Sequence, residues 1–227
     1  KDQLHRQAVE VDNISFAYAG SERKIFNNLS FTINAGERIA VIGENGVGKT
    51  TLLKLLMNEV QPQFGEIRWA EKAKPGYYSQ DHSELFKSET SLTDWIAEFV
   101  RAGGYEGGDV ETLIRGTLGR LLFSGDEVKK PVKIISGGEQ GRMLFGKLML
   151  LHSNVLIMDE PTNHLDMESI ESLNTGLEKF PGTLVFVSHD REFVSSLATR
   201  VFEVKGDGKI VDYLGGYEDY LASQGVE

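Results

Sequence analysis

The sequence predicts an α/β fold built on a parallel sheet, and three observations support this prediction. Three short apolar segments, 37–42, 154–158 and 183–187, have the composition of buried strands. The first two lead through a turn into stretches with helical spacing, at 50–57 and 167–179. Polar residues follow each strand directly, at the edge where parallel sheets bind their ligands. Strands and helices that alternate in this way form a parallel sheet covered by helices.

Length and composition are those of one large globular domain. The chain has 227 residues, of which 40% are hydrophobic and 26% are charged, and its net charge is -10. This charge argues against non-specific nucleic-acid binding over the whole surface, and no DNA partner is expected. No apolar run approaches the roughly 18 residues of a membrane helix, and the start does not resemble a signal peptide. We therefore predict a cytoplasmic protein without a membrane domain.

The chain divides into a core and an inserted helical segment. The polar run 1–7, which begins with lysine rather than methionine, is predicted to be the remnant of a linker in a longer protein. The remaining residues are predicted to form one domain, with a core at 8–81 and 134–227. Alternating segments near its start predict an antiparallel β-subdomain. Residues 82–133 contain two helical patterns separated by glycines and are predicted to form a helical subdomain.

Basic residues gather in this helical segment, against the acidic average of the chain. A solvated charged face is one interpretation, and contact with RNA phosphates is the other. The residues are Arg115, Arg120, Lys129, Lys130 and Lys133. Ser91 and Asp94 in the same segment have the spacing of a capping box at a helix start.

A glycine-rich loop between the first apolar strand and its helix predicts a phosphate site. The loop fits G-x-x-x-x-G-K-[ST], whereas a dinucleotide fingerprint would need a glycine where Thr51 stands. Glycines let the backbone N–H groups point inward, and the following helix presents its positive end to an anion. Lys49 then reaches the outer phosphates and Thr50 holds a magnesium ion. The predicted nucleotide-binding residues of the loop are Gly43, Glu44, Asn45, Gly46, Val47, Gly48, Lys49, Thr50 and Thr51.

The polar residues after the other two apolar strands predict the catalytic groups. Asp159 and Glu160 end the strand at 154–158, where Asp159 suits a metal ion and Glu160 suits a base for water. His189 follows the strand at 183–187 and suits a hydrogen bond to a γ-phosphate. The other histidines have no metal-ligand spacing and are predicted to be structural.

Two further residues have weaker support. Tyr18 follows a predicted strand, where its ring either stacks on a nucleotide base or only packs the sheet. Gln80 ends another predicted strand, where its amide oxygen contacts a metal ion or water, or is merely exposed. For both residues the two interpretations stay open.

A second glycine pair stands at the start of a predicted helix. Ser136, Gly137, Gly138, Glu139 and Gln140 precede the helical stretch 142–151. A serine and two glycines at a helix start suit a phosphate, and a simple N-cap is the alternative.

Taken together, these motifs resemble the nucleotide-binding domains of ABC ATPases, over nearly the whole chain. Tyr18 resembles the A-loop aromatic, 43–51 the Walker A loop and Gln80 the Q-loop. Residues 136–140 resemble the signature motif, and 155–160 the Walker B strand with its glutamate. The D-loop corresponds to 163–166 and the switch histidine to His189.

Within these ATPases the chain resembles the ABC-F family. The runs DEPTNHLD at 159–166, SHDR at 188–191, GEQGR at 138–142 and GGYEDY at 215–220 carry this resemblance. The runs at 118–123 and 166–173 are most similar to the second ATPase domain of the YbiT type.

The resemblance implies an ATPase that uses ATP and Mg²⁺. Lys49 would hold phosphates, Thr50, Gln80 and Asp159 would surround Mg²⁺, Glu160 would activate water and His189 would steady the γ-phosphate. ATP would lie between this domain and a second ABC domain of the same full-length chain. Residues 136–140 of this domain would complete the binding site for the nucleotide that the second domain holds. An isolated domain is therefore expected to be weakly active.

The resemblance also implies a role on ribosomes in translation, exercised by the full-length protein. The alternative is the cytosolic ATPase subunit of an ABC membrane transporter.

Overall fold

A six-stranded sheet forms the centre of the molecule. The computed structural model describes residues 6–107 and 109–225. The strand order is β5-β6-β7-β3-β8-β9, with parallel pairs from β5 to β8 and an antiparallel pair at the β8–β9 edge. The α/β fold with a parallel core is therefore confirmed. The strands are β3 (Arg38–Ile42), β5 (Pro75–Tyr78), β6 (Val155–Asp159), β7 (Thr183–Val187), β8 (Arg200–Val204) and β9 (Ile210–Tyr213).

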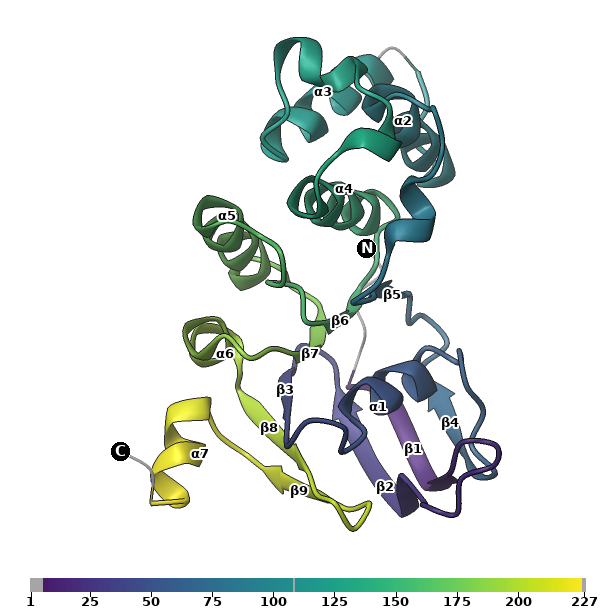
Figure 1. Cartoon of the computed structure of the whole chain (residues 1–227), viewed down its shortest axis with the longest axis vertical. Coiled ribbons are helices and arrows are strands. Elements are labelled where there is room, and N and C mark those ends of the chain that lie inside the picture. Colours follow the sequence, from purple (N-terminus) through teal and green to yellow (C-terminus); the bar gives the residue numbers. More distant parts are fainter. Residues whose placement is uncertain (1–5, 108, 226–227) are drawn as a thin grey trace.

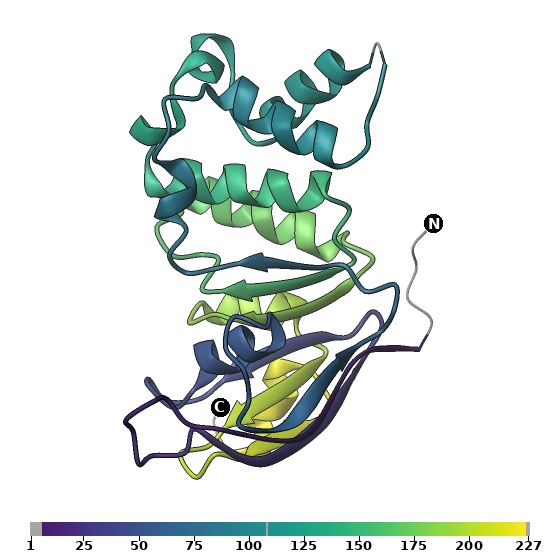
Figure 2. The same cartoon turned by 90° about the vertical axis from the view of Figure 1, so that its right-hand side faces the viewer.

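Both faces of the sheet are buried at its central strands β6 and β7, where every residue is buried, which explains why these two strands are almost wholly apolar. Successive side chains of a strand point to opposite faces. In β6, Val155 and Ile157 pack towards one hydrophobic cluster, whereas Leu156 and Met158 pack towards another. Figure 2 shows α4 and α5 on one side of the strands and α1 on the other. The helices are α1 (Lys49–Leu56), α4 (Gly137–Leu150), α5 (Met167–Glu178), α6 (Arg191–Leu197) and α7 (Tyr217–Ser223).

An antiparallel sheet of three strands packs over the α1 face. Its order is β2-β1-β4, with β1 at Gln7–Phe16, β2 at Phe26–Asn34 and β4 at Phe64–Trp69. Gln7 pairs with Asn34 in this sheet, so it is a strand residue and not part of a linker as predicted. The rest of the predicted linker, apart from Arg6, lies outside the described residues.

The helical segment forms one end of the long axis of the molecule (Figure 1). Its elements are the short 3-10 turns at Ser83–Phe86, Gly125–Lys129 and Val132–Ile134, together with α2 (Leu92–Ala102) and α3 (Val110–Arg120). Buried Ile96 and Leu118 of this segment belong to the same hydrophobic cluster as Met143 of α4 and Leu156 of β6. The segment therefore shares its core with the helix-covered face of the sheet.

Most basic residues of the helical segment are paired with acids. Arg115 pairs with Glu111, Lys129 with Asp126, Lys130 with Glu127 and Lys133 with Glu89. This pairing favours the solvated face over contact with RNA phosphates. The Ser91 hydroxyl caps α2 by accepting from the Asp94 N–H, but it donates to the Asp94 carboxylate, so the box is not reciprocal.

Candidate functional site

A cavity of about 370 Å³ opens where β3, β6 and β7 end. Residues far apart in the sequence meet here because the carboxyl ends of parallel strands share one edge. Most of the predicted site residues line it, together with Ile25 and Val187, which no sequence signal indicated. The lining residues are Tyr18, Ile25, Asn45, Gly46, Gly48, Lys49, Thr50, Thr51, Gln80, Asp159, Glu160, Val187 and His189.

The phosphate loop needs glycine at two of its positions. Gly43 and Gly48 have φ values of 144° and 124°, which side chains rarely tolerate. A Cβ on Gly48 would also lie 2.6 Å from Cγ2 of Ile25. Gly48 is the N-cap of α1 and provides no side-chain hydrogen bond. The first N–H groups of α1 therefore remain available to an anion.

Lys49 folds back across this loop. Its Nζ donates to the carbonyl oxygens of Gly43 at 2.8 Å and Glu44 at 2.9 Å. The residue is buried, and burial lowers the pKa of Lys49, opposed by the charges of Glu160 and Asp159. Gly43, Glu44 and Val47 are not among the residues that line the cavity. Val47 is buried in the core, so any part it takes is through its backbone.

Asp159 presents two buried oxygens that are without a hydrogen-bond partner among the described residues. Burial raises the pKa of Asp159, and the nearby Thr50 hydroxyl, Lys54 and Lys49 oppose this rise, although the Thr50 hydroxyl does not reach regular hydrogen-bond geometry. An unpaired buried carboxylate is costly, and a cation compensates it.

These residues fit Mg²⁺. Magnesium in phosphate sites is held by one or two carboxylates with substrate phosphates and water. Thr50 and Gln80 line the same cavity as Asp159 and supply the oxygen atoms that Mg²⁺ prefers.

Glu160 and His189 contact each other at the edge of the cavity. The N–H of His189 donates to Oε2 of Glu160 at 3.2 Å, and Nε2 of His189 lies 3.1 Å from Oε1. Burial raises the pKa of Glu160, and the neighbouring His189 opposes this most strongly. Glu160 has φ of 49°, an unusual value that turns its side chain out of the strand direction. The sequence predicted both residues but not their contact.

Tyr18 borders the cavity and packs the sheet as well. Its hydroxyl lies 3.0 Å from Oγ1 of Thr51, and its ring meets Phe16 edge-on at 5.0 Å between centroids. Tyr18 as a whole is 44% exposed, so part of it remains accessible from the cavity.

The predicted signature residues lie outside this cavity. Gly137 and Gln140 line a second cavity of about 360 Å³, which Gln80 and Glu160 border as well. Ser136 and Glu139 form a capping box on α4, in which Ser136 Oγ accepts from the Glu139 N–H and Glu139 Oε2 accepts from the Ser136 N–H. Gly138 lies against the carbonyl of His164, 3.1 Å from the position of a Cβ.

Across the described part of the chain, no helix has the length and apolar character required to cross a membrane.

Known proteins resemble the chain in sequence. The probable ATP-binding protein YbiT of Escherichia coli O157:H7 is 52% identical over 225 residues, covering 99% of this chain and 41% of that protein. ABC transporter F family member 5 of Arabidopsis thaliana is 38% identical over 217 residues, covering 95% and 30%. The ATP-binding protein Uup of Haemophilus influenzae is 38% identical over 225 residues, covering 96% and 34%. The chain thus spans less than half the length of these curated relatives.

Solved structures share the fold. The ATP-binding cassette MJ0796, a dimer bound to ADP and Pi in a post-hydrolysis state, has a TM-score of 0.75 and 19% identity, over 91% of this chain and 98% of that one. A bacterial Atm1-family ABC exporter with ATP bound has a TM-score of 0.77 and 21% identity, over 98% and 41%. Residues 26–163 match the ABC transporter family. The chain therefore belongs to the ABC transporter family, and within it the chain is similar to YbiT, Uup and a member of the ABC transporter F family.

Proposed function

We propose that the cavity binds ATP with Mg²⁺ and hydrolyses the ATP to ADP and phosphate. The observation that carries this proposal is the carboxylate of Asp159, whose two buried oxygens have no hydrogen-bond partner among the described residues. Asp159 lines the same cavity as Lys49 and the start of α1, which has no side-chain cap. A triphosphate and a divalent cation would compensate all of these groups at once.

Each residue then has a chemical role. Lys49 exchanges its loop carbonyls for phosphate oxygens, and Tyr18 offers a ring edge or face to the base. Thr50, Gln80 and Asp159 would hold Mg²⁺, which when bound offsets the negative charge of the phosphates. Positioning and electrostatic stabilisation do most of the work in such phosphoryl transfers.

Glu160 is the proposed base. It accepts a proton from a water molecule whose oxygen attacks the γ-phosphorus, while the bond from this phosphorus to the bridging oxygen breaks and ADP leaves with the electron pair. His189 holds the carboxylate of Glu160 through its backbone N–H and ring, and its exposed ring lies at the cavity edge, where it would contact the γ-phosphate.

The proposed site is one half of a shared site. The signature residues Ser136, Gly137 and Gly138 do not line the cavity of their own domain, and we propose that a second ABC domain completes it. The similar cassette MJ0796 is a dimer. We propose that the second domain belongs to the same longer chain and that this domain alone turns over slowly.

We further propose that the longer protein acts on ribosomes in the cytoplasm, as a regulator of translation. The support is the similarity to ABC-F proteins. The basic residues of the helical segment add no support, because most of them are already paired with acids.

The Glu160→Gln variant of the full-length protein tests the proposal. ATP binding should persist, while turnover should fall about 100-fold or more, because the variant lacks the base. Glu171→Gln, a change of an exposed glutamate on α5, is the control and should leave turnover unchanged. Turnover that survives Glu160→Gln contradicts the role of Glu160. Sedimentation of the same variant with ribosomes should require ATP, and association that ignores ATP contradicts the ribosomal role.

A further inference from the structure

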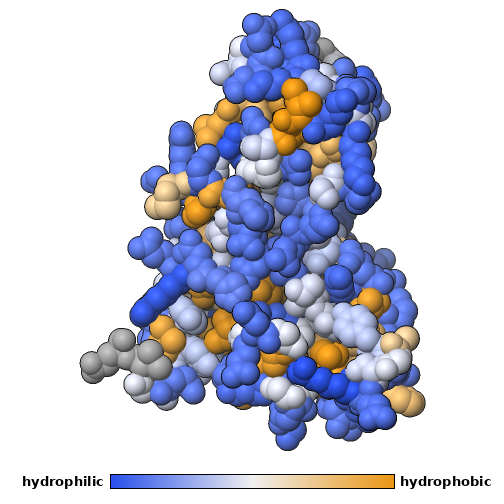
Figure 3. Space-filling model, viewed as in Figure 1, coloured by the Kyte–Doolittle hydropathy of each residue, from blue (hydrophilic) through white to orange (hydrophobic). Residues whose placement is uncertain are grey.

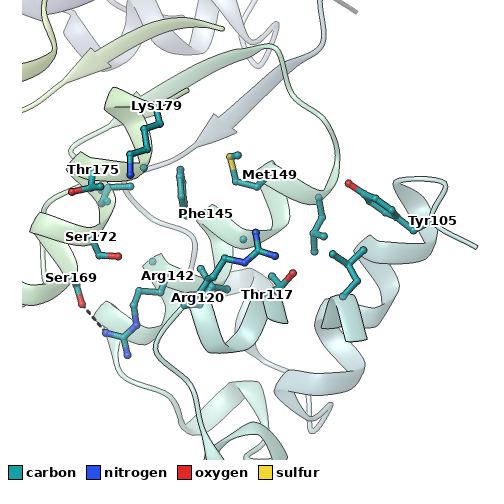
Figure 4. A pocket seen from close by; sticks show the side chains of 17 residues that line it. Tyr105, Thr117, Arg120, Arg142, Phe145, Met149, Ser169, Ser172, Thr175 and Lys179 are labelled. Atoms are coloured by element: carbon teal, nitrogen blue, oxygen red, sulfur yellow. Dashed lines mark hydrogen bonds between the residues drawn. The ribbon is translucent and has the colours of Figure 1, made fainter. Parts of the chain in front are cut away.

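A groove of about 640 Å³ lies between α3, α4 and α5, away from the proposed ATP site. It shares no lining residue with either cavity described above. Hydrophobic surface is visible where these helices meet (Figure 3), and Figure 4 shows the side chains around the groove. Its volume falls within the range of natural binding pockets, about 300–1,000 Å³.

The groove combines an apolar floor with a cationic rim. Phe145 and Met149 of α4, with Leu121 and Leu173, supply apolar surface. The rim carries three cations and no acid, although the chain as a whole has a net charge of -10. The cations are Arg120, Arg142 and Lys179.

Two of these cations, Arg120 and Lys179, have no ion pair with any residue that the structure describes. The Lys179 side chain has no hydrogen bond or ion pair to any residue that the structure describes. Arg120 donates from Nε to the carbonyl of Gly116 at 3.2 Å, and its side chain reaches into the groove in Figure 4. Arg142 is partly compensated, because its Nη1 donates to Ser169 at 2.7 Å and lies 4.0 Å from a carboxylate oxygen of Asp166, and its guanidinium lies over the Phe123 ring. Its buried Nε has no hydrogen-bond partner among the described residues. The rim therefore attracts an anionic ligand.

We propose that this groove docks an acidic amphipathic helix of a partner protein, a function beyond ATP hydrolysis. Apolar side chains at helical spacing would fill the floor, and flanking carboxylates would meet the three cations. Charge complementarity selects this occupant, since a groove lined by three cations and no acid, two of the cations without an ion pair among the described residues, repels basic helices. The apolar floor argues against RNA, because most of it is aliphatic rather than an exposed aromatic platform for bases.

A synthetic peptide tests the proposal on the full-length protein. The probe is a fluorescein-labelled peptide of 18 residues with leucine at one helical face and glutamate elsewhere; the control peptide has lysine in place of glutamate. Fluorescence anisotropy should show saturable binding of the acidic peptide, weakened by salt. Equal binding of the lysine peptide, or no binding of the acidic one, overturns the proposal, and so does a single-stranded RNA that binds in its place.

Gly176→Leu is the sharpest variant. Gly176 lies within α5 on the groove lining, and a Cβ there would meet the Phe145 ring at 3.5 Å, which is ordinary contact. The Cβ of leucine would therefore fit without moving the backbone, the rest of the side chain would take up space in the groove, and leucine favours a helix more than glycine does. Peptide binding should be lost, while ATP binding and the unfolding temperature should be kept.

A charge variant supplies the second readout. Arg120→Glu combined with Lys179→Glu should weaken the acidic peptide about tenfold or more and reduce the salt dependence. Lys87→Glu, at an exposed site outside the groove, is the matched control. Peptide affinity that survives both the filled groove and the reversed rim overturns the proposal.

Discussion

The starts of α1 and α4 are both rich in glycine, yet α1 begins without a side-chain hydrogen bond to its first N–H groups, whereas α4 begins with such a bond. Gly48 begins α1 without a side-chain cap, and Lys49 turns back to carbonyls of its own loop. Ser136 begins α4 within a complete capping box. The first start also faces Asp159, whose oxygens have no partner in the described part of the structure.

This difference separates a site that needs a ligand from a loop that is satisfied by itself. Unpaired groups at α1 cost stability until an anion and a cation arrive, and part of the binding free energy compensates them. The start of α4 already has its side-chain hydrogen bonds within its own domain and does not need a ligand to pair them. Its glycine N–H groups and the hydroxyl of Ser136 are available only to a ligand that approaches from outside.

Among the variants at the two helix starts, Lys49→Ala should have the largest effect, and it should act on the affinity for ATP. The affinity for ATP should fall about 100-fold or more, because charge-assisted hydrogen bonds to phosphate are lost. Calorimetric titration with ATP and Mg²⁺ measures this change. Lys54→Ala on the same helix is the control, since Lys54 does not line the cavity and its loss should cost much less. Equal losses in both variants would show that general positive charge, rather than the loop, binds the nucleotide.

The second-largest difference is expected between alanine variants at the two helix starts, Gly48→Ala at α1 and Gly137→Ala at α4. Gly48→Ala forces a side chain into φ of 124° and against Ile25, so it should lower the free energy of unfolding by about 1–3 kcal/mol and abolish ATP binding. Gly137→Ala places a Cβ 3.5 Å from His164 and should leave both quantities nearly unchanged in a single domain. Urea unfolding and ATP titration check both variants. Equal destabilisation would remove the distinction between the loops.

Asp159→Asn should raise the stability of the nucleotide-free domain by about 1 kcal/mol, because it removes an unpaired buried charge. The variant should also lose any stabilisation by ATP with Mg²⁺.

The pH dependence of the free energy of unfolding also tests whether the buried carboxylate of Asp159 destabilises the nucleotide-free domain. Folding raises the pKa of Asp159, so the folded state holds this proton more tightly than the unfolded state. The contribution of Asp159 to stability should therefore fall as pH rises from the ordinary carboxyl range through the raised pKa. Urea unfolding across this range should show a smaller fall for Asp159→Asn, and identical pH profiles would contradict this account.

The capping box at α4 should give the smallest effect. Ser136→Ala should lower the free energy of unfolding by about 1 kcal/mol, as the loss of an N-cap does. Glu139→Gln is the matched control, because glutamine also completes such a box. Thermal unfolding of the two variants measures the difference. If Ser136→Ala leaves stability unchanged, the box seen at α4 contributes nothing to the fold.

Local residue patterns predicted the strands of the central sheet and the residues at its edge. Short apolar runs such as 154–158 favour strands that are buried on both faces, and polar side chains follow them directly. The phosphate loop was recognisable for a similar reason, since its glycines, Lys49 and Thr50 act within nine neighbouring residues. Both signals are local, so no knowledge of distant contacts was needed. Only the first residue of β1, Gln7, escaped prediction, because the run that precedes it is polar.

The tertiary structure alone decided how these residues meet. Glu160 and His189 are 29 positions apart and touch because β6 and β7 are neighbours in the sheet. Ile25 borders the phosphate loop only because β2 packs over α1. The groove between α3, α4 and α5 has no sequence signature, since helices from separate parts of the chain form it. Contacts of this kind depend on the packing of whole elements, which local residue patterns do not specify.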